Sequence, residues 1–236
     1  MVKLGVNIDH VASLRELRHA IDPEPAFAAS ICEEAGADSI VVHLREDRRH
    51  IKEGDLFILK KIVKTRLNLE MSIANDIVQI ACLIKPDQAT LVPEKRKELT
   101  TEGGLDVINN FHRIKEAAKL LQKKNITVSL FIDPEKKQID AAKKMGIEML
   151  EFHTGRYANA KNKKEQEMYF GQIVSVVNYA LKKGLTVNAG HGLNYNNVTR
   201  IAKIKGIEEL NIGYSIICRA VLVGLKQAVC EMKALV

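Results

Sequence analysis

The sequence predicts an α/β fold, a (β/α)8 TIM barrel, from three features of the chain. Short apolar runs alternate with segments in which apolar residues recur every three or four positions. Short links, three of which contain a glycine, join these segments to the next run. Ionisable residues follow several runs, which is typical of enzymes whose chemistry lies at the carboxyl ends of parallel strands. A doubly wound, open α/β sheet is the alternative architecture.

Eight apolar runs are the predicted strands. Gly36, Gly146 and Gly184 precede three of them, and each would end a helix in the left-handed conformation that glycine accepts. Helix-to-strand links this short belong to βαβ units, so the strands are expected to be parallel. The runs cover residues 4–8, 39–43, 67–71, 88–92, 127–132, 148–153, 185–189 and 208–212.

Amphipathic stripes predict the helices between the strands. Apolar residues at spacings of three and four mark residues 56–63, 114–121 and 173–181, and a last helix over about 216–234 closes the chain. We find no linker, low-complexity stretch or change in composition along the sequence. Residues 1–236 are therefore expected to form a single TIM-barrel catalytic domain.

Composition points to the cytoplasm. Hydrophobic residues make up 46% of the chain, yet no run approaches the roughly 20 apolar residues that cross a bilayer. The N-terminus shows no basic segment followed by an apolar stretch and a cleavage site, so no export signal is expected. The four cysteines form no C-x-x-C pair and are expected to be small buried hydrophobes, with metal ligands or disulfides as the alternatives.

The net charge of +7 is compatible with nucleic acid, an anionic membrane or phosphorylated substrates. The lysines are scattered over the predicted helices, and aromatic residues that would stack on bases make up only 5% of the chain. Phosphorylated small molecules are therefore the expected partners, with no nucleic acid and no membrane.

Histidines and carboxylates mark the expected site. Alternation along a strand puts residues two apart on the same side, so that Asn7 and Asp9 share a face. The residues that lie within two positions of the ends of the predicted strands are Asp9, His10, His43, Glu70, Asp133, His153 and His191.

Glu70 lies between Leu69 and Met71, and apolar surroundings raise the pKa of a carboxyl group toward neutrality. A carboxyl group of this kind suits proton transfer, and the alternative is a structural carboxylate paired with an arginine. For His43 and His191 the alternative is a core histidine that donates to a backbone carbonyl.

Metal and cofactor chemistry have weaker support in the sequence. Two histidines and a glutamate are possible zinc ligands, but the H-E-x-x-H spacing is absent, so no metal is predicted. Neither G-x-G-x-x-G nor G-x-x-x-x-G-K-[ST] occurs, so no nucleotide cofactor is expected. No predicted strand ends in a lysine, which leaves either chemistry without a Schiff base on the enzyme or an amine that belongs to the substrate.

Three segments have features of phosphate binding or of a lid. The turns at 188–192 and 211–215 follow strands seven and eight, where barrels commonly bind phosphate, and glycines there allow close approach of the backbone. The basic segment 45–50 is either a second anion site or a charge cluster paired with its own acidic residues. The loop 93–106 has the length and the glycine pair of a mobile lid.

Taken together, these residues resemble the pyridoxine 5'-phosphate synthase family, the enzymes that close the ring of vitamin B6. The resemblance covers essentially the whole chain. It is carried by residues 5–10, 42–50, 68–71, 91–96, 100–106, 188–193 and 209–213.

The resemblance implies a barrel with extra helices, a homo-octamer and a reaction without a cofactor. That reaction condenses 1-deoxy-D-xylulose 5-phosphate with 3-amino-2-oxopropyl phosphate and gives pyridoxine 5'-phosphate, phosphate and water. The amine is then in the substrate, which agrees with the missing strand-end lysine. The mechanism implied is addition of the amine to the ketone, loss of water, elimination of phosphate, addition of water and aldol-type ring closure, with protons moved at each step.

The resemblance also assigns roles to residues of this chain. His43 and Glu70 would accept protons, and His191 would donate one. Asp9, His10, Arg45, His50 and Thr100 would hold the xylulose phosphate, whereas Asn7, Arg18, Gly192, Gly213 and Tyr214 would hold the amino ketone phosphate.

Tyr214 departs from the family pattern, in which histidine is frequent after the glycine of strand eight. A backbone N–H contact to phosphate would survive this change, whereas a side-chain role would not. Two other functions stay open at this point: a phosphosugar isomerase or epimerase, and a basic scaffold or RNA-associated barrel without catalysis.

Overall fold

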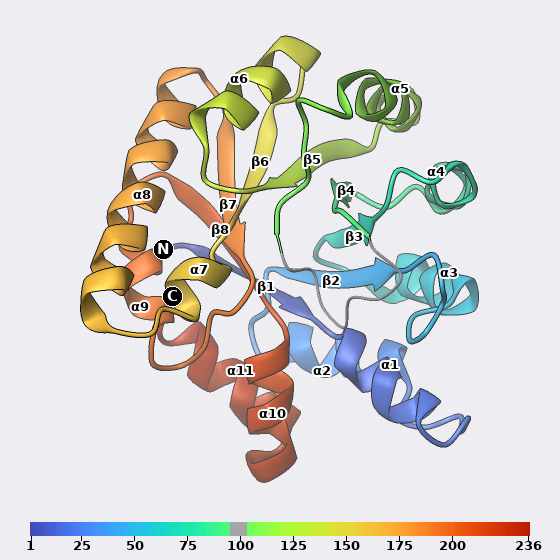
Figure 1. Cartoon of the computed structure of the whole chain (residues 1–236). Coiled ribbons are helices and arrows are strands. Elements are labelled where there is room, and N and C mark those ends of the chain that lie inside the picture. Colours follow the sequence, from blue (N-terminus) through green and yellow to red (C-terminus); the bar gives the residue numbers. More distant parts are fainter. Residues whose placement is uncertain (95–102) are drawn as a thin grey trace.

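A computed structural model of the chain describes residues 1–94 and 103–236, and the strands in these residues form one closed barrel. Each strand pairs in parallel with the next, and β8 pairs with β1 (Figure 1). The strands are β1 Lys3–Asn7, β2 Ser39–Leu44, β3 Leu67–Met71, β4 Gln88–Leu91, β5 Thr127–Ile132, β6 Met149–His153, β7 Thr186–Gly190 and β8 Ile207–Ile212. The predicted TIM barrel is confirmed, and each predicted strand matches within one residue at either end.

The helices surround the barrel on its outside (Figure 1). Those of the described residues are α1 Asp9–Glu16, α2 Pro25–Glu34, α3 Glu53–Ile62, α4 Asn75–Ile84, α5 Phe111–Gln122, α6 Lys136–Met145, α7 Gly155–Ala158, α8 Lys163–Lys182, α9 Val198–Ala202, α10 Tyr214–Val223 and α11 Leu225–Lys233. The three predicted stripes lie in α3, α5 and α8, and they bury Leu56, Ile114 and Ile173 among other residues.

Glycines set the ends of several helices. Gly36, Gly146 and Gly184 have φ of +97°, +89° and +69°, which confirms the left-handed conformations expected after α2, α6 and α8. Gly224 corrects the prediction of one last helix over about 216–234. With φ +85° and ψ 151° it separates α10 from α11. Both helices bury apolar residues, so the spacing of apolar residues alone did not reveal the break.

The cysteines are all free thiols, but the expectation that they are buried is only partly right. Cys32 in α2 is buried and Cys82 in α4 is half-buried, whereas Cys218 and Cys230 are exposed. Cys218 lies on α10 and Cys230 on α11, where Sγ of Cys230 is 3.6 Å from the carbonyl oxygen of Ala35 at the end of α2.

The interior of the barrel is polar rather than filled with the branched apolar side chains that are usual in this fold. Asn211 of β8 donates to Glu151 of β6 over 2.7 Å, although the two strands are not neighbours, so both side chains point inward. Leu67 and Leu69 alternate with Asn68 and face the helices instead. The buried polar residues on the strands are Ser39, Asn68, Gln88, Thr90, Ser129, Glu151, Asn188, Glu209 and Asn211.

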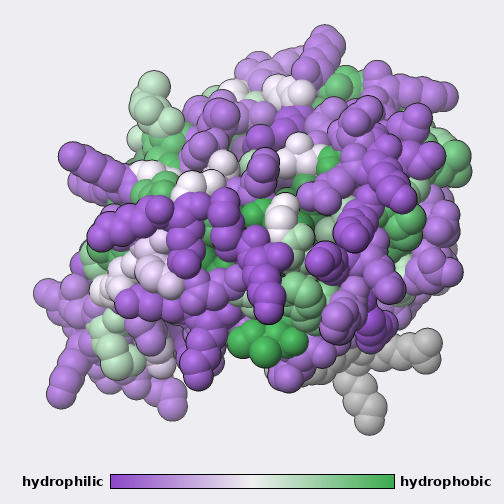
Figure 2. All heavy atoms as spheres, turned by 90° about the horizontal axis from the view of Figure 1, so that it is seen from above, coloured by the Kyte–Doolittle hydropathy of each residue, from purple (hydrophilic) through white to green (hydrophobic). Residues whose placement is uncertain are grey.

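The outer surface is uneven in character. Figure 2 shows a face covered mainly by hydrophilic side chains, with hydrophobic ones in small groups. The face formed by α1, α2 and α10 is different, because Leu14, Phe27, Val221 and Leu222 expose 47%, 69%, 74% and 78% of their surface there. Among the described residues, no helix has the length and apolar character that a membrane crossing requires.

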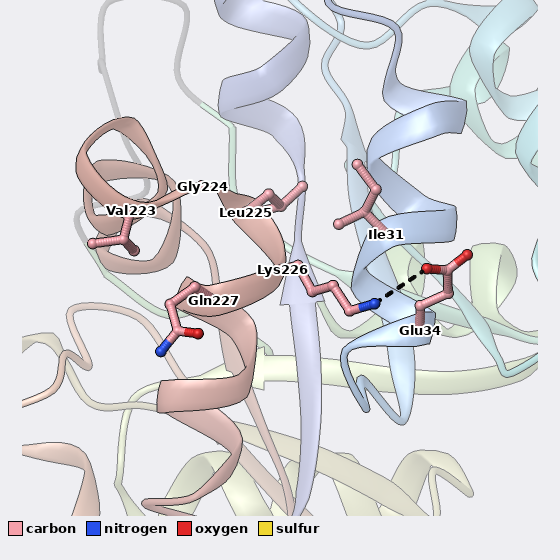
Figure 3. A pocket seen from close by; sticks show the side chains of 7 residues that line it. All are labelled: Ile31, Glu34, Val223, Gly224, Leu225, Lys226 and Gln227. Atoms are coloured by element: carbon pink, nitrogen blue, oxygen red, sulfur yellow. Dashed lines mark ion pairs between the residues drawn. The ribbon is translucent and has the colours of Figure 1, made fainter.

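Two pockets lie on this outer face. One, of about 420 Å³, is lined mostly by apolar side chains that include Leu14, Phe27 and Val221. The other, of about 450 Å³, lies where α2 faces the break at Gly224, and Lys226 forms an ion pair with Glu34 over 3.7 Å beside it (Figure 3). Neither pocket is lined by a residue predicted for the site.

Candidate active site

Asp9, His43 and Glu70 gather at the carboxyl ends of β1, β2 and β3. Each contributes one carboxylate oxygen or ring nitrogen, and these atoms lie within 4.8 Å of one another. The register of the sheet causes this, because His43 lies directly opposite Glu70 and Asp9 follows the end of β1. Three groups predicted from separate parts of the chain therefore form one cluster.

Asp9 ties this cluster together through the backbone. Its Oδ1 accepts a hydrogen bond from the backbone N–H of His43 over 2.8 Å. Its Oδ2 accepts from Nδ2 of Asn7 over 2.9 Å, and its own N–H donates to Oδ1 of Asn7 over 2.9 Å. Asn7 and Asp9 thus share a face as predicted, and they fix the position of His43.

Glu94 lies against the imidazole of His43, and the sequence analysis did not identify it. Oε1 of Glu94 is 2.9 Å from Nε2 of His43, with only 5% and 7% of the two side chains exposed. Its Oε2 accepts from the backbone N–H of Glu46 over 3.0 Å. Burial alone would raise the pKa of Glu94, but its hydrogen bond to His43 and the charge of that residue bring the pKa below its usual value.

Glu70 has a pKa well above its usual value. Burial is the main cause, and the negative charges of Glu151 and Asp9 add to it. Both causes disfavour the ionised form, so Glu70 holds its proton more strongly than an exposed glutamate does. The direction expected from its apolar sequence neighbours is confirmed, although Glu151 and Asp9 were not foreseen as contributors.

A second cluster, formed by Asp133, His153 and His191, lies at the ends of β5, β6 and β7. Nδ1 of His153 is 3.0 Å from Oδ1 of Asp133, and the rings of His153 and His191 are 4.9 Å apart in an edge-to-face arrangement. Burial, with a contribution from the charge of His153, lowers the pKa of His191 to about 4. His191 is therefore neutral at physiological pH.

Glu151 connects the two clusters. Its charge acts on Glu70, and the position that a Cβ would take at Gly190, the residue before His191, is 2.3 Å from Oε1 of Glu151. Burial raises the pKa of Glu151, the charge of Glu209 adds to this, and the hydrogen bond from Asn211 opposes it. Since the carboxyl ends of all parallel strands open onto one mouth of a barrel, both clusters face the same space.

The turn after β7 is held in an unusual conformation. His191 and Gly192 both have φ of +77°, a region that is unfavourable for a histidine. The backbone N–H of Thr154 donates to the carbonyl oxygen of Gly190 over 2.8 Å, and its hydroxyl donates to that of His191 over 2.6 Å, which holds the turn in place. A side chain at Gly192 would lie 2.7 Å from Cβ of Ala158, so glycine is required there.

The end of β8 packs against β1. A Cβ at Gly213 would lie 2.9 Å from Cβ of Asn7, so only glycine allows this approach. Tyr214 opens α10 with 69% of its surface exposed, and its ring lies 5.3 Å from that of His10. Gly213 is therefore a neighbour of Asn7, and Tyr214 is a neighbour of His10, while the binding roles of these four residues stay predictions.

In the basic segment 45–50, Arg45 and Arg49 pair with the segment's own Asp47, which is one of the two alternatives that the sequence left open. Asp47 accepts from Nε of Arg45 over 3.2 Å and from Arg49 over 2.6 Å, and the two arginines keep the pKa of Asp47 well below its usual value against the effect of burial. Arg48 pairs with Glu53 and Asp76 instead. The anion-binding roles of Arg45 and His50 stay predictions.

Two predicted site residues are not brought to the barrel mouth by the described structure. Arg18 is exposed and follows the end of α1, whose eight residues extend about 12 Å from Asp9. Thr100 lies outside the described residues, as does most of the loop predicted as a lid.

Asp9, His43 and Glu70 also offer oxygen and nitrogen atoms of the kind that bind a metal ion. Both oxygens of Asp9 already accept hydrogen bonds, and Nε2 of His43 faces Glu94. Such hydrogen bonds occur around metal ligands as well as around acid–base groups, so the expectation of no metal stays a prediction.

Comparison with known proteins gives one consistent result. The family model described as pyridoxal phosphate biosynthesis protein PdxJ matches residues 4–236. The pyridoxine 5'-phosphate synthase of Geotalea uraniireducens (strain Rf4) is 55% identical over 236 residues, which cover 100% of this chain and 99% of that protein. The protein of the same name from Geobacter sp. (strain M21) is 56% identical over the same shares.

Solved structures show the fold alone. The tryptophan synthase A-subunit from Pyrococcus furiosus has a TM-score of 0.65 and 12% sequence identity, over 99% of this chain and 97% of that one. A 4-hydroxy-2-oxoglutarate aldolase has a TM-score of 0.61 and 16% identity, over 98% of this chain and 92% of that one. Identity this low carries no information about the reaction.

Proposed function

Because the chain belongs to the family of pyridoxal phosphate biosynthesis protein PdxJ, and is an enzyme of the pyridoxine 5'-phosphate synthase type, we propose which reaction it catalyses. It condenses 1-deoxy-D-xylulose 5-phosphate with 3-amino-2-oxopropyl phosphate and releases pyridoxine 5'-phosphate, phosphate and water. The observation that supports this most is the meeting of Asp9, His43 and Glu70 within 4.8 Å at the mouth of the barrel. A ring closure of this kind needs several proton transfers and therefore several adjacent acid–base groups.

The amine of the second substrate supplies the nitrogen of the ring. No strand of the described barrel ends in a lysine, so the barrel offers no amine of its own at the usual place. Addition of the substrate amine to the ketone, with loss of water, needs a group that delivers a proton to the departing oxygen. Glu70 fits this step, because its raised pKa makes the protonated form of the carboxyl group more favourable than in an exposed glutamate.

The pKa shifts refine the roles that the resemblance implied. Glu70 holds a proton more strongly than an exposed glutamate does, and it accepts a proton only in its ionised form. His191 starts neutral, since its pKa is lowered to about 4, and becomes a donor after it has gained a proton. A phosphate dianion bound beside His191 favours the imidazolium form and so prepares this residue to donate.

His43 is placed for proton transfer by two carboxylates. Asp9 holds its backbone N–H and Glu94 faces its Nε2, so that the ring orientation is determined from both sides. Glu94 is a positioning residue in this proposal, because it acts on the substrate through His43. Imine and enamine intermediates would then meet an imidazole in a fixed orientation.

The two phosphate groups are assigned to two different sets of residues at the mouth of the barrel. Gly192, Gly213 and Tyr214, with Asn7, would hold the amino ketone phosphate through backbone N–H groups. Asp9, His10, Arg45 and His50 would hold the xylulose phosphate, with Thr100 of the segment that is not described. The close approach of β8 to β1 at Gly213 supports the first assignment.

The proposal includes an assembly and a location. We assign residues 1–236 to one catalytic domain that works without a cofactor or metal in the cytoplasm, as a homo-octamer that binds neither nucleic acid nor membrane. The exposed apolar face of α1, α2 and α10 supports an association of subunits. Arg18 is exposed and follows the end of α1, so in this proposal the arginine of a neighbouring subunit contacts the bound phosphate.

The test is a reaction with both phosphorylated substrates in metal-free buffer. Phosphate release and the absorbance of the pyridine ring are followed together, with each substrate omitted in turn as the control. The proposal predicts that phosphate and chromophore appear at equal rates and only when both substrates are present. Turnover of one substrate alone without phosphate release would indicate an isomerase or epimerase, and neither signal would reject the proposed reaction.

A further inference from the structure

Asp133 and His153 form a buried pair beside His191 that the proposed reaction has not used. His153 is the last residue of β6 and has 5% of its surface exposed, and Asp133 directly follows β5. Among the described residues Nε2 of His153 has no hydrogen-bond partner, although it is buried. A buried polar atom without a partner costs free energy, and such atoms in native structures usually have a functional reason.

The backbone of His191 leaves little freedom to its side chain. Its φ of +77° is held by the hydrogen bond from Thr154 to its carbonyl oxygen, 2.6 Å long, and by the same residue's bond to Gly190. With the backbone fixed, the direction of the imidazole depends on the rings that surround it. Phe131 lies 6.5 Å from the ring of His191 and 5.2 Å from that of His153.

Gly155 makes the contact between the two imidazoles possible. A Cβ at this position would lie 2.4 Å from Nε2 of His153 and 3.1 Å from Cδ2 of His191. Any side chain there would have to push the histidines out of place. The glycine, the first residue of α7, therefore leaves room for an edge-to-face pair with ring centres 4.9 Å apart.

Asp133 fixes the state of His153. Its Oδ1 lies 3.0 Å from Nδ1 of His153, and a carboxylate there keeps a proton on Nδ1. The hydrogen bond to His153 lowers the pKa of Asp133, against the effect of burial, so the carboxylate stays ionised.

We propose that His153, held by Asp133, is a positioning residue that orients the imidazole of His191 and controls when His191 takes up a proton. This rests on the proposed function, in which His191 exchanges protons with substrate. The titratable and charged groups around the pair in the described structure are Asp133 after β5, Glu151 and His153 on β6, and Arg156 on α7. Of these, His153 is the one in ring contact with His191.

The charge of His153 favours the neutral form of His191 before substrate binds. Positive charge on His153 disfavours a second positive charge on His191, so the pair keeps His191 neutral and able to accept a proton. A phosphate dianion that enters the site offsets this repulsion. His191 then gains its proton when substrate is bound rather than before.

The test is a titration of His191 by NMR in protein labelled at histidine nitrogen, in the whole protein without substrate. His153→Phe keeps a ring against Phe131 and His191 but removes both nitrogens and the charge. His112→Gln is the matched control, because His112 is exposed on α5. The signals that disappear from the spectrum of His191→Gln are assigned to His191.

The proposal predicts that the titration midpoint of His191 rises by about one pH unit in His153→Phe and stays in place in His112→Gln. With both substrates, the acidic limb of the rate profile of His153→Phe is expected to move upward by a similar amount. A midpoint that moves by less than about 0.3 unit in His153→Phe would overturn the proposal. If His153→Phe does not fold, Asp133→Asn replaces it, and an unchanged His191 midpoint there has the same meaning.

The NMR arm does not need catalysis, so it separates this proposal from the proposed function. A shifted midpoint in a protein that makes no pyridoxine 5'-phosphate supports the pair and rejects the reaction. Normal turnover with an unshifted midpoint supports the reaction and rejects the pair.

Discussion

Replacement of Glu70 by glutamine is expected to make the protein more stable and the enzyme much slower. The two side chains have the same shape, but glutamine cannot ionise or carry a proton. Glu70 lies in a cluster where burial and the charges of Glu151 and Asp9 raise its pKa well above the usual value. The wild-type protein therefore has to keep a proton on this group that the unfolded chain would release near neutral pH.

The size of the stability effect follows from proton linkage. A carboxyl group whose pKa is raised in the folded state contributes fully to stability below its unfolded pKa of about 4.3, and this contribution is lost as the pH rises through the folded value. The loss reaches at most about 1.4 kcal/mol per pH unit in that window. Because Glu70 is partly exposed, we expect less than this maximum. Between pH 5 and pH 7 the free energy of unfolding of Glu70→Gln should rise by about 1–2 kcal/mol relative to that of the wild type.

Urea unfolding at pH 5 and pH 7 measures this difference, with Glu208→Gln as the control because Glu208 is an exposed glutamate on β8. The control is expected to show no change with pH beyond about 0.5 kcal/mol. Turnover of Glu70→Gln is expected to fall by about 10²–10⁴-fold. A stability gap that does not change with pH would refute the raised pKa, and wild-type turnover would remove Glu70 from the mechanism.

Four further substitutions test neighbouring parts of the account. His43→Ala is expected to lower kcat by about 10²–10⁴-fold, and a variant with normal kcat would exclude His43 as an acid–base group. Glu94→Gln keeps the size of the side chain that faces Nε2 of His43 but removes its charge. We therefore expect kcat to fall by about 10-fold or more with little change in KM. An effect on KM alone would contradict a positioning role. Tyr214→Phe is expected to leave binding of the amino ketone phosphate nearly unchanged, and a large loss in calorimetry would show that the hydroxyl takes part. Gly104→Ala is expected to lower the free energy of unfolding in urea by about 3 kcal/mol, because the new Cβ would lie 2.0 Å from the backbone nitrogen of Asp133. Gly54→Ala is the control: the space around Gly54 is open, so this change is expected to be neutral or stabilising.

The strands were predictable because their sequence signal is local. Glycines at positive φ end the preceding helices, and apolar residues that face the helices alternate with polar residues inside the barrel, as in Leu67–Met71. The break at Gly224 was missed because apolar residues continue at helical spacing on both sides of it. The burial of the cysteines was overestimated since helical sequence does not show which side of α10 and α11 remains uncovered.

The site was predictable where a functional residue ends a strand, as His43, Glu70 and His191 do or nearly do. Glu94 was missed because it lies three residues beyond β4, after Pro93, where no periodic pattern indicates the direction of a side chain. The pairing of Asp133 with His153 was also out of reach. It depends on the register between β5 and β6 and on the space that Gly155 leaves.

A crystal structure with both substrates, or with stable analogues of them, tests the central claim most directly. The account predicts that His43, Glu70 and His191 each reach the bound molecules within hydrogen-bond distance, directly or through one water, and that two phosphate groups lie at two separate positions in the same mouth. Phosphates bound elsewhere on the protein, or any one of these three side chains directed away from the bound molecules, would contradict it.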